Sequence, residues 1–103
     1  MNAAEGTDRT LRREWEEKLI TDYYDYRWRR IMDPLCDKMQ RWKDGDLTHA
    51  EMEKTLNEVH EETCEVRSLF RQRRDRLVNL IQHWDREWFE SWLLEHRRPY
   101  EGS

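Results

Sequence analysis

Residues 43–51, KDGDLTHAE, contain the strongest turn signal in the chain. Gly45 has no Cβ, so it can adopt the left-handed backbone conformation that ends many helices. Thr48 is followed three residues later by Glu51, and this spacing is typical of a capping box at the start of a helix. The stretch therefore predicts a helix, a tight turn at residues 44–48, and then a second helix.

Apolar residues recur at helical spacing on both sides of this turn. The residues before it are Tyr24, Trp28, Ile31, Leu35, Met39 and Trp42. Those after it follow a heptad-like seam: Met52, Leu56, Val59, Thr63, Val66, Phe70, Arg73, Leu77, Leu80 and Trp84. We expect a single helical domain over residues 1–103, with helices at about 8–43 and 49–97 and flexible ends at 1–7 and 99–103.

The composition favours the all-α class. With 3 Gly and 2 Pro in 103 residues, the chain lacks the turn residues that a sheet protein needs. Charged residues make up 41% of the chain, but 6 Trp, 4 Tyr and 2 Phe argue against disorder. The predicted fold is a long antiparallel helical hairpin.

Pro34 interrupts the first predicted helix. Proline has no backbone N–H and clashes with the preceding helical turn, whereas it is well tolerated at the first position of a helix. Because helical spacing continues on both sides, we expect one helix with a kink at Pro34. The alternative is two consecutive helices, the second capped by Asp33.

The C-terminal arm has the densest apolar surface. Trp84, Trp88 and Trp92 are spaced by four residues and so share one helix face. Since two helices alone bury only one side each, we expect two hairpins to pair as a homodimeric four-helix bundle. The predicted interface is Trp84, Trp88, Phe89, Trp92 and Leu93. A different protein could occupy this face instead, and in a monomer the face would either stay unfilled or fold back on the first arm.

A weaker pattern concerns metal binding. His60 and Cys64 lie one helical turn apart beside Glu61, and together they could contact a metal ion. The alternative is a solvated acidic face next to a buried cysteine. Because the Glu-x-x-His signature of di-iron bundles is missing at His60, His83 and His96, we expect no metal or other cofactor.

Basic residues gather further along the second arm. Arg67, Arg71 and Arg74 could bind a phosphate or another anionic partner. The alternative is pairing with acidic residues of the first arm, including Glu16, or setting the register of an assembly. The net charge of −4 argues against general nucleic-acid binding.

The sequence contains no pattern of catalytic residues. Ser68 and Ser91 have no histidine one turn away, and three glycines cannot supply a phosphate-binding loop. No apolar run is long enough to span a bilayer, and the N-terminus lacks a signal-peptide layout. We therefore expect a cytoplasmic, non-enzymatic interaction or scaffold protein.

Overall fold

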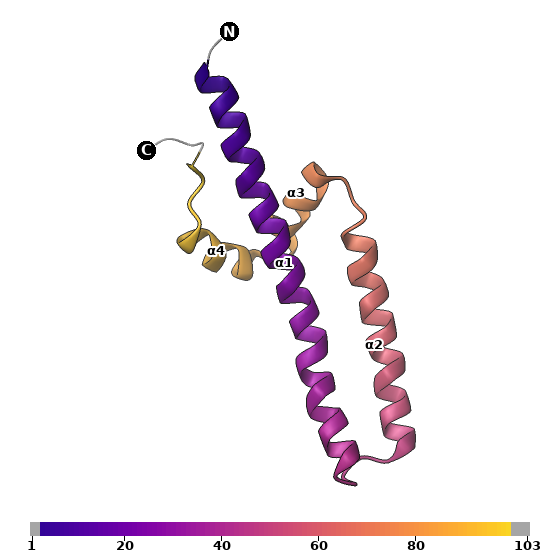
Figure 1. Cartoon of the computed structure of the whole chain (residues 1–103). Coiled ribbons are helices and arrows are strands. Elements are labelled where there is room, and N and C mark those ends of the chain that lie inside the picture. Colours follow the sequence, from indigo (N-terminus) through magenta and orange to yellow (C-terminus); the bar gives the residue numbers. More distant parts are fainter. Residues whose placement is uncertain (1–2, 100–103) are drawn as a thin grey trace. The chain divides into compact units, whose positions relative to one another are not determined.

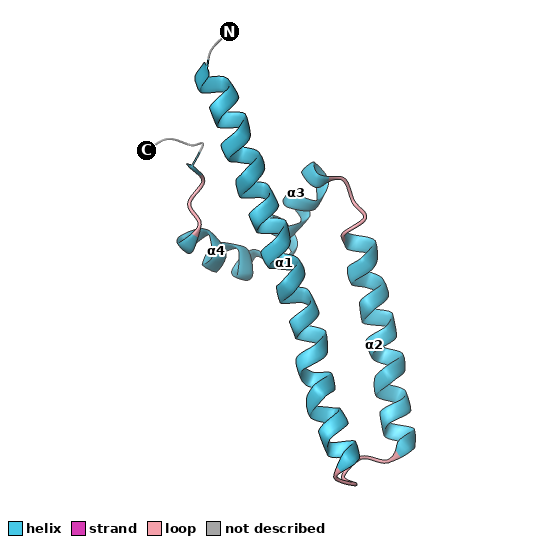
Figure 2. Ribbon diagram, in the orientation of Figure 1, coloured by secondary structure: helices cyan, strands magenta, loops and turns pink. Residues whose placement is uncertain are grey.

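The structure, a computed structural model, describes residues 3–99 and the side chains of residues 7–99. Within that range 86% of the residues are helical and no strand occurs, so the all-α prediction is confirmed. The helices are α1 (Ala3–Lys43), α2 (His49–Leu69), α3 (Arg74–Trp84) and α4 (Arg86–Glu95) (Figures 1 and 2). α1 begins before the predicted residue 8. Of the predicted flexible ends, 1–7 and 99–103, residues 1–2 and 100–103 lie outside the described residues, and residues 3–7 are part of α1.

The chain divides into two compact units. Unit 1 contains the described residues up to Tyr23 and those from Gln72 onward, whereas unit 2 is Tyr24–Arg71. α1 therefore contributes to both units, α2 belongs to unit 2, and α3 and α4 belong to unit 1. Each unit has its own buried residues and is described separately.

α1 continues through Pro34 as one α-helix of 41 residues. The alternative of two helices divided at Asp33 is therefore wrong. Proline has no backbone N–H, so one hydrogen bond of the helix is lost. The helical residues on both sides of Pro34 compensate for this loss. A kink at this position stays a prediction.

The turn between α1 and α2 has the chemistry expected from its sequence. Gly45 has a φ of 83°, which lies in the left-handed region that glycine adopts without strain. The backbone N–H of Glu51 donates to Thr48 Oγ1 at 3.1 Å, so Thr48 caps the first turn of α2. The end of α1 and the start of α2 are joined directly by a hydrogen bond from Trp42 Nε1 to His49 Nδ1 at 2.9 Å.

The prediction of one continuous helix over residues 49–97 is wrong, because the chain forms three helices there. α2 ends at Leu69, and a further break at Asp85 separates α3 from α4. Neither break contains glycine or proline, so local propensity did not reveal them. The breaks allow α3 and α4 to bury apolar side chains within unit 1, namely Leu77, Val78, Ile81, Phe89 and Trp92. Each such burial contributes about 1.5–3 kcal/mol, which exceeds the cost of a few non-helical residues.

An aromatic cluster joins α4 to α1 in unit 1. The ring of Trp15 packs edge-on against Phe89 and Trp92, with centroid distances of 6.2 and 5.3 Å. Both buried indole N–H groups have acceptors. Trp15 Nε1 donates to the backbone carbonyl of His96 at 2.8 Å, and Trp92 Nε1 donates to Asp22 Oδ2 at 2.8 Å. The cluster therefore combines apolar packing with satisfied polar groups.

The break between α3 and α4 is also tied to α1. Tyr23 is 2% exposed, and its hydroxyl donates to Asp85 Oδ2 at 3.1 Å. The Tyr23 ring also packs against Trp88, with a centroid distance of 4.9 Å. α4 and the break before it therefore cover this side of α1.

We predict that Trp92→Ala destabilises the protein by about 3–5 kcal/mol, since it removes a large buried ring from a packed cluster. Trp84→Ala is the matched control, because the Trp84 side chain is 73% exposed and its loss changes stability by about 0.5 kcal/mol or less. Urea denaturation followed by circular dichroism measures both values. Equal stability of the two variants would contradict the assignment of Trp92 to the core.

We also predict that Asp22→Ala costs about 1–3 kcal/mol, because it leaves the Trp92 N–H buried without its acceptor. Asp25→Ala is a close control. Each aspartate pairs with a cation four residues away, Asp22 with Lys18 and Asp25 with Arg29, so both changes remove one helical ion pair. The Asp25 side chain is 65% exposed and its pair is worth at most a few tenths of a kcal/mol. If both variants unfold at the same urea concentration, the Asp22–Trp92 bond has no net effect on stability.

Candidate functional site

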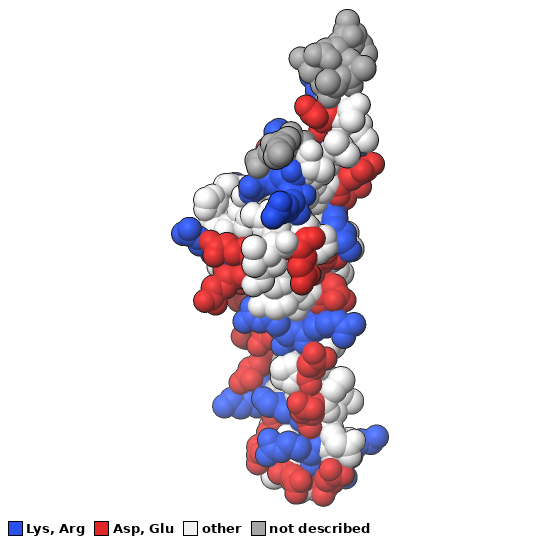
Figure 3. Space-filling model, turned by 90° about the vertical axis from the view of Figure 1, so that its left-hand side faces the viewer, with Lys and Arg blue, Asp and Glu red and all other residues white. Residues whose placement is uncertain are grey.

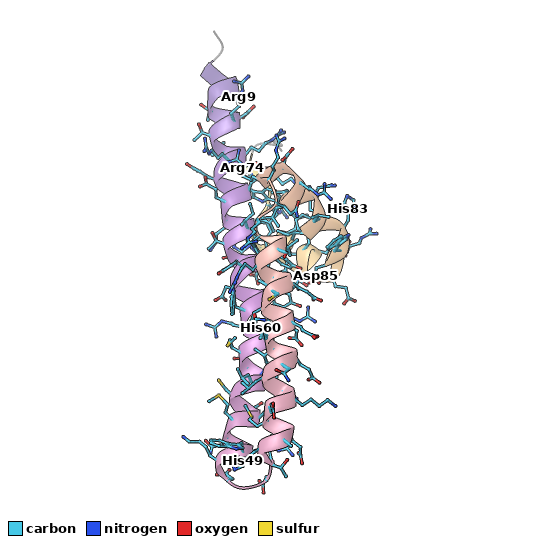
Figure 4. All side chains as sticks on the ribbon, turned by 90° about the vertical axis from the view of Figure 1, so that its right-hand side faces the viewer. Arg9, His49, His60, Arg74, His83 and Asp85 are labelled. Atoms are coloured by element: carbon cyan, nitrogen blue, oxygen red, sulfur yellow. The ribbon has the colours of Figure 1, made fainter. Side chains whose placement is uncertain are left out.

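Unit 2 is a single layer of two antiparallel segments, residues 24–43 of α1 and all of α2 (Figures 1 and 4). At one end Tyr24 and Phe70 make an edge-on ring contact with a centroid distance of 4.9 Å. At the other end lies the turn. The buried residues between the segments are few: Ile31, Met52, Thr55 and Val66. A layer with so little enclosed apolar surface leaves at least one face uncovered.

One face of this layer carries large apolar side chains, which we call the open face and define as Trp28, Met39 and Leu56. Met39 is 46% and Leu56 is 51% exposed, and Trp28 is half-buried. Leu56 follows the buried Met52 by four residues, whereas Trp28 precedes Ile31 by three. These spacings rotate each side chain in the same sense away from the line of contact. Because the segments are antiparallel, rotations in the same sense point to the same face of the layer.

The opposite face of the layer has a different character. It contains a shallow groove with apolar residues at its base and charged residues along both sides, including Arg30, Lys38, Glu58 and Glu62. The groove therefore presents a mixed polar surface that water can cover. Of the exposed large apolar residues of unit 2, Met39 and Leu56 lie on the open face, and Tyr24 and Trp42 lie outside it.

Trp28 has a polar group without a partner. Its indole Nε1 is buried and has no hydrogen-bond partner among the described residues. A buried N–H without an acceptor costs free energy of about 1–3 kcal/mol. Because the atom is buried, a second molecule on the open face would reach it only after the Trp28 side chain moved.

The structure separates the five residues predicted as an interface. Phe89 and Trp92 are buried in unit 1 at 6% and 7% exposure, so they cannot contact a partner while unit 1 is folded. Trp88 and Leu93 are half-buried, and Trp84 is exposed. Most of the tryptophan-rich arm folds back on α1, which was one of the two outcomes left open for a monomer. The structure does not bring these five side chains together as one exposed surface.

The candidate metal ligands lie on α2. His60 Nε2 and Cys64 Sγ are 3.8 Å apart, and both side chains are exposed. Within residues 7–99, no three histidine, cysteine or acidic side chains are grouped so that they could hold a metal, and Glu61 does not complete such a set. The expectation of a buried cysteine is wrong, because Cys64 is free and exposed.

The candidate anion-binding arginines fall into different units. Arg67 and Arg71 belong to unit 2, while Arg74 belongs to unit 1 and pairs with Glu16 at 3.6 Å. The basic strip expected on one continuous helix is therefore interrupted, and part of its charge is used in an intramolecular pair as the sequence suggested. On the face shown in Figure 3, basic and acidic side chains are interspersed along the helices.

Sequence reasoning missed the open face as a site. It placed Trp28, Met39 and Leu56 on the seam between the two arms, because their helical spacing matches that of the buried residues. The signal that was missed is the position of these side chains. Each lies at one edge of the apolar stripe of its own helix, three or four residues along the chain from a residue at the centre of that stripe. That edge can be recognised only when the partner segment is known.

No helix in the described part of the chain has the length and apolar content needed to cross a membrane. Comparison of the chain with protein-family models, with curated proteins and with solved structures found no match. The functional argument therefore rests on the residues and geometry of the chain itself.

Proposed function

We propose that this chain is a non-enzymatic interaction or scaffold protein that forms a homodimer through the open face of unit 2. In the dimer, two helix pairs stack face to face as a four-helix bundle. The hairpin in this proposal is shorter than the sequence suggested, since it consists of residues 24–43 and α2. A bend at Pro34 would let α1 follow the surface of the second copy.

The observation that carries the proposal is the joint exposure of Met39 and Leu56 on one face of a two-helix layer. Large apolar residues gathered on one face commonly mark interaction sites. A twofold axis would place each of them in the interface twice, because both copies use the same surface. Covering one such side chain contributes about 1.5–3 kcal/mol at most, so four partly exposed side chains supply a useful part of a dimer's binding energy.

A second copy fits this face better than an unrelated small ligand would. Small molecules bind in enclosed pockets, and the groove described for unit 2 lies on the opposite face. A further helix pair would continue the helix-on-helix packing already present in unit 2. The exposed Trp84 of unit 1 would remain available for a different protein.

The cysteines support the proposed location. Cys36 and Cys64 are both free and exposed. Exposed free thiols suit a reducing compartment, and we therefore place the protein in the cytoplasm. The proposed function requires no cofactor and no catalytic residue.

The test is the solution mass measured by light scattering over a dilution series in the presence of EDTA. We predict a dimer for the natural chain and at least a tenfold weaker dimer for Leu56→Lys, because a charge would be buried in the interface. Glu58→Lys is the control, since Glu58 is exposed beside the groove on the opposite face and a lysine there leaves association unchanged.

Circular dichroism checks that both variants keep the helical content of the natural chain. A natural chain that stays monomeric at the highest concentration would overturn the proposal. Equal dimerisation of Leu56→Lys and Glu58→Lys would show that the interface lies elsewhere.

A further inference from the structure

His60 and Cys64 already have the spacing of two ligands of one zinc ion. Zinc binds histidine nitrogen at about 2.0–2.1 Å and cysteine sulfur at about 2.3 Å, with tetrahedral geometry. These distances place the two ligand atoms roughly 3.6 Å apart. In the structure, Nε2 of His60 and Sγ of Cys64 are 3.8 Å apart. The two side chains could therefore bind the same ion with little movement.

The pair is also exposed and lies in an acidic environment. Both side chains are exposed on α2, and Figure 4 shows His60 within this helix. The helix carries six glutamates, at positions 51, 53, 58, 61, 62 and 65, and two basic residues, Lys54 and Arg67. This balance makes the local potential negative and attracts a divalent cation.

The position of the pair links it to the open face. Leu56, His60 and Cys64 follow each other at intervals of four residues, so they form one stripe along α2. Leu56 belongs to the open face, and the stripe continues from it toward the outer edge of the layer. A second copy that covers Leu56 would approach His60 next.

We propose that His60 and Cys64 are half of a zinc site that is completed by the same two residues of a second copy. This inference rests on the proposed homodimer and adds a metal to it. One described chain contributes only two ligands, whereas a structural zinc site needs four. Twofold symmetry doubles the pair to two cysteines and two histidines, a common set for structural zinc.

An antiparallel pairing of the two α2 helices satisfies the geometry. When the twofold axis passes midway between residues 60 and 64, His60 of one copy faces Cys64 of the other. The four ligand atoms then surround the axis, and the zinc ion lies on it. Each thiol loses its proton to the solvent as it binds, and the neutral imidazoles bind through Nε2.

The experiment uses the full chain, reduced and freed of metal with EDTA, to which zinc is then added. We expect one zinc ion per two chains by titration calorimetry and at least a tenfold tighter dimer by light scattering. Cobalt replaces zinc as a coloured probe, and its thiolate absorption band should appear with the same stoichiometry. His60→Ala and Cys64→Ser should each remove the metal effect on the dimer.

Cys36→Ser is the matched control, because Cys36 is equally free and exposed but has no histidine one turn away. It should bind zinc like the natural chain. Binding of one zinc per chain without a change in mass would overturn the shared site, as would zinc binding that survives in Cys64→Ser. A dimer that forms in EDTA and ignores zinc would overturn this inference and leave the proposed function intact. Failure of the dimer itself is detected separately, by the dilution series in EDTA.

Discussion

The buried indole of Trp92 is the contact on which the arrangement of unit 1 depends. It packs against Trp15, stacks on the His96 ring at a centroid distance of 4.5 Å, and donates its N–H to Asp22. Trp92 lies on α4, a short helix that the break at Asp85 separates from α3. Within unit 1 this break lets α4 place Trp92 against Trp15 and Asp22 of α1. Tertiary burial therefore outweighs the helical propensity of a segment without glycine or proline.

α1 serves as the common support of two different packing arrangements. Its first part presents Trp15, Leu19 and Tyr23, which are buried within unit 1. Its later part presents Ile31 toward α2 within unit 2. The first arrangement buries Trp15, Phe89 and Trp92 among three helices and leaves Trp84 and Leu94 exposed, whereas the second has two helices and leaves Met39 and Leu56 exposed. The proposed interface uses the second arrangement, because Met39 and Leu56 lie on one face of the layer.

The proposed dimer and the proposed zinc site use neighbouring positions on α2 for different purposes. Covering Leu56 supplies apolar burial, which is non-directional and tolerates small shifts between two copies. Coordination by His60 and Cys64 is directional, so it would define one register of antiparallel helices. A bundle of this kind would be responsive to the availability of the metal. The Glu-rich surface of α2 favours the cation without forming a site by itself.

The sequence alone determined the helical class, the turn and the helix cap, because these depend on residues close together in the chain. Gly45 and Thr48 act through their own backbone and immediate neighbours, and the structure has them as predicted. The sequence also identified His60 and Cys64 as neighbours, since a separation of four residues is fixed by helix geometry. It did not reveal that Phe89 and Trp92 are core residues or that Leu56 is exposed. Whether these side chains are buried depends on which helix covers the apolar stripe that carries them. Only the tertiary structure decided this, because contacts between segments distant in the chain override the local pattern.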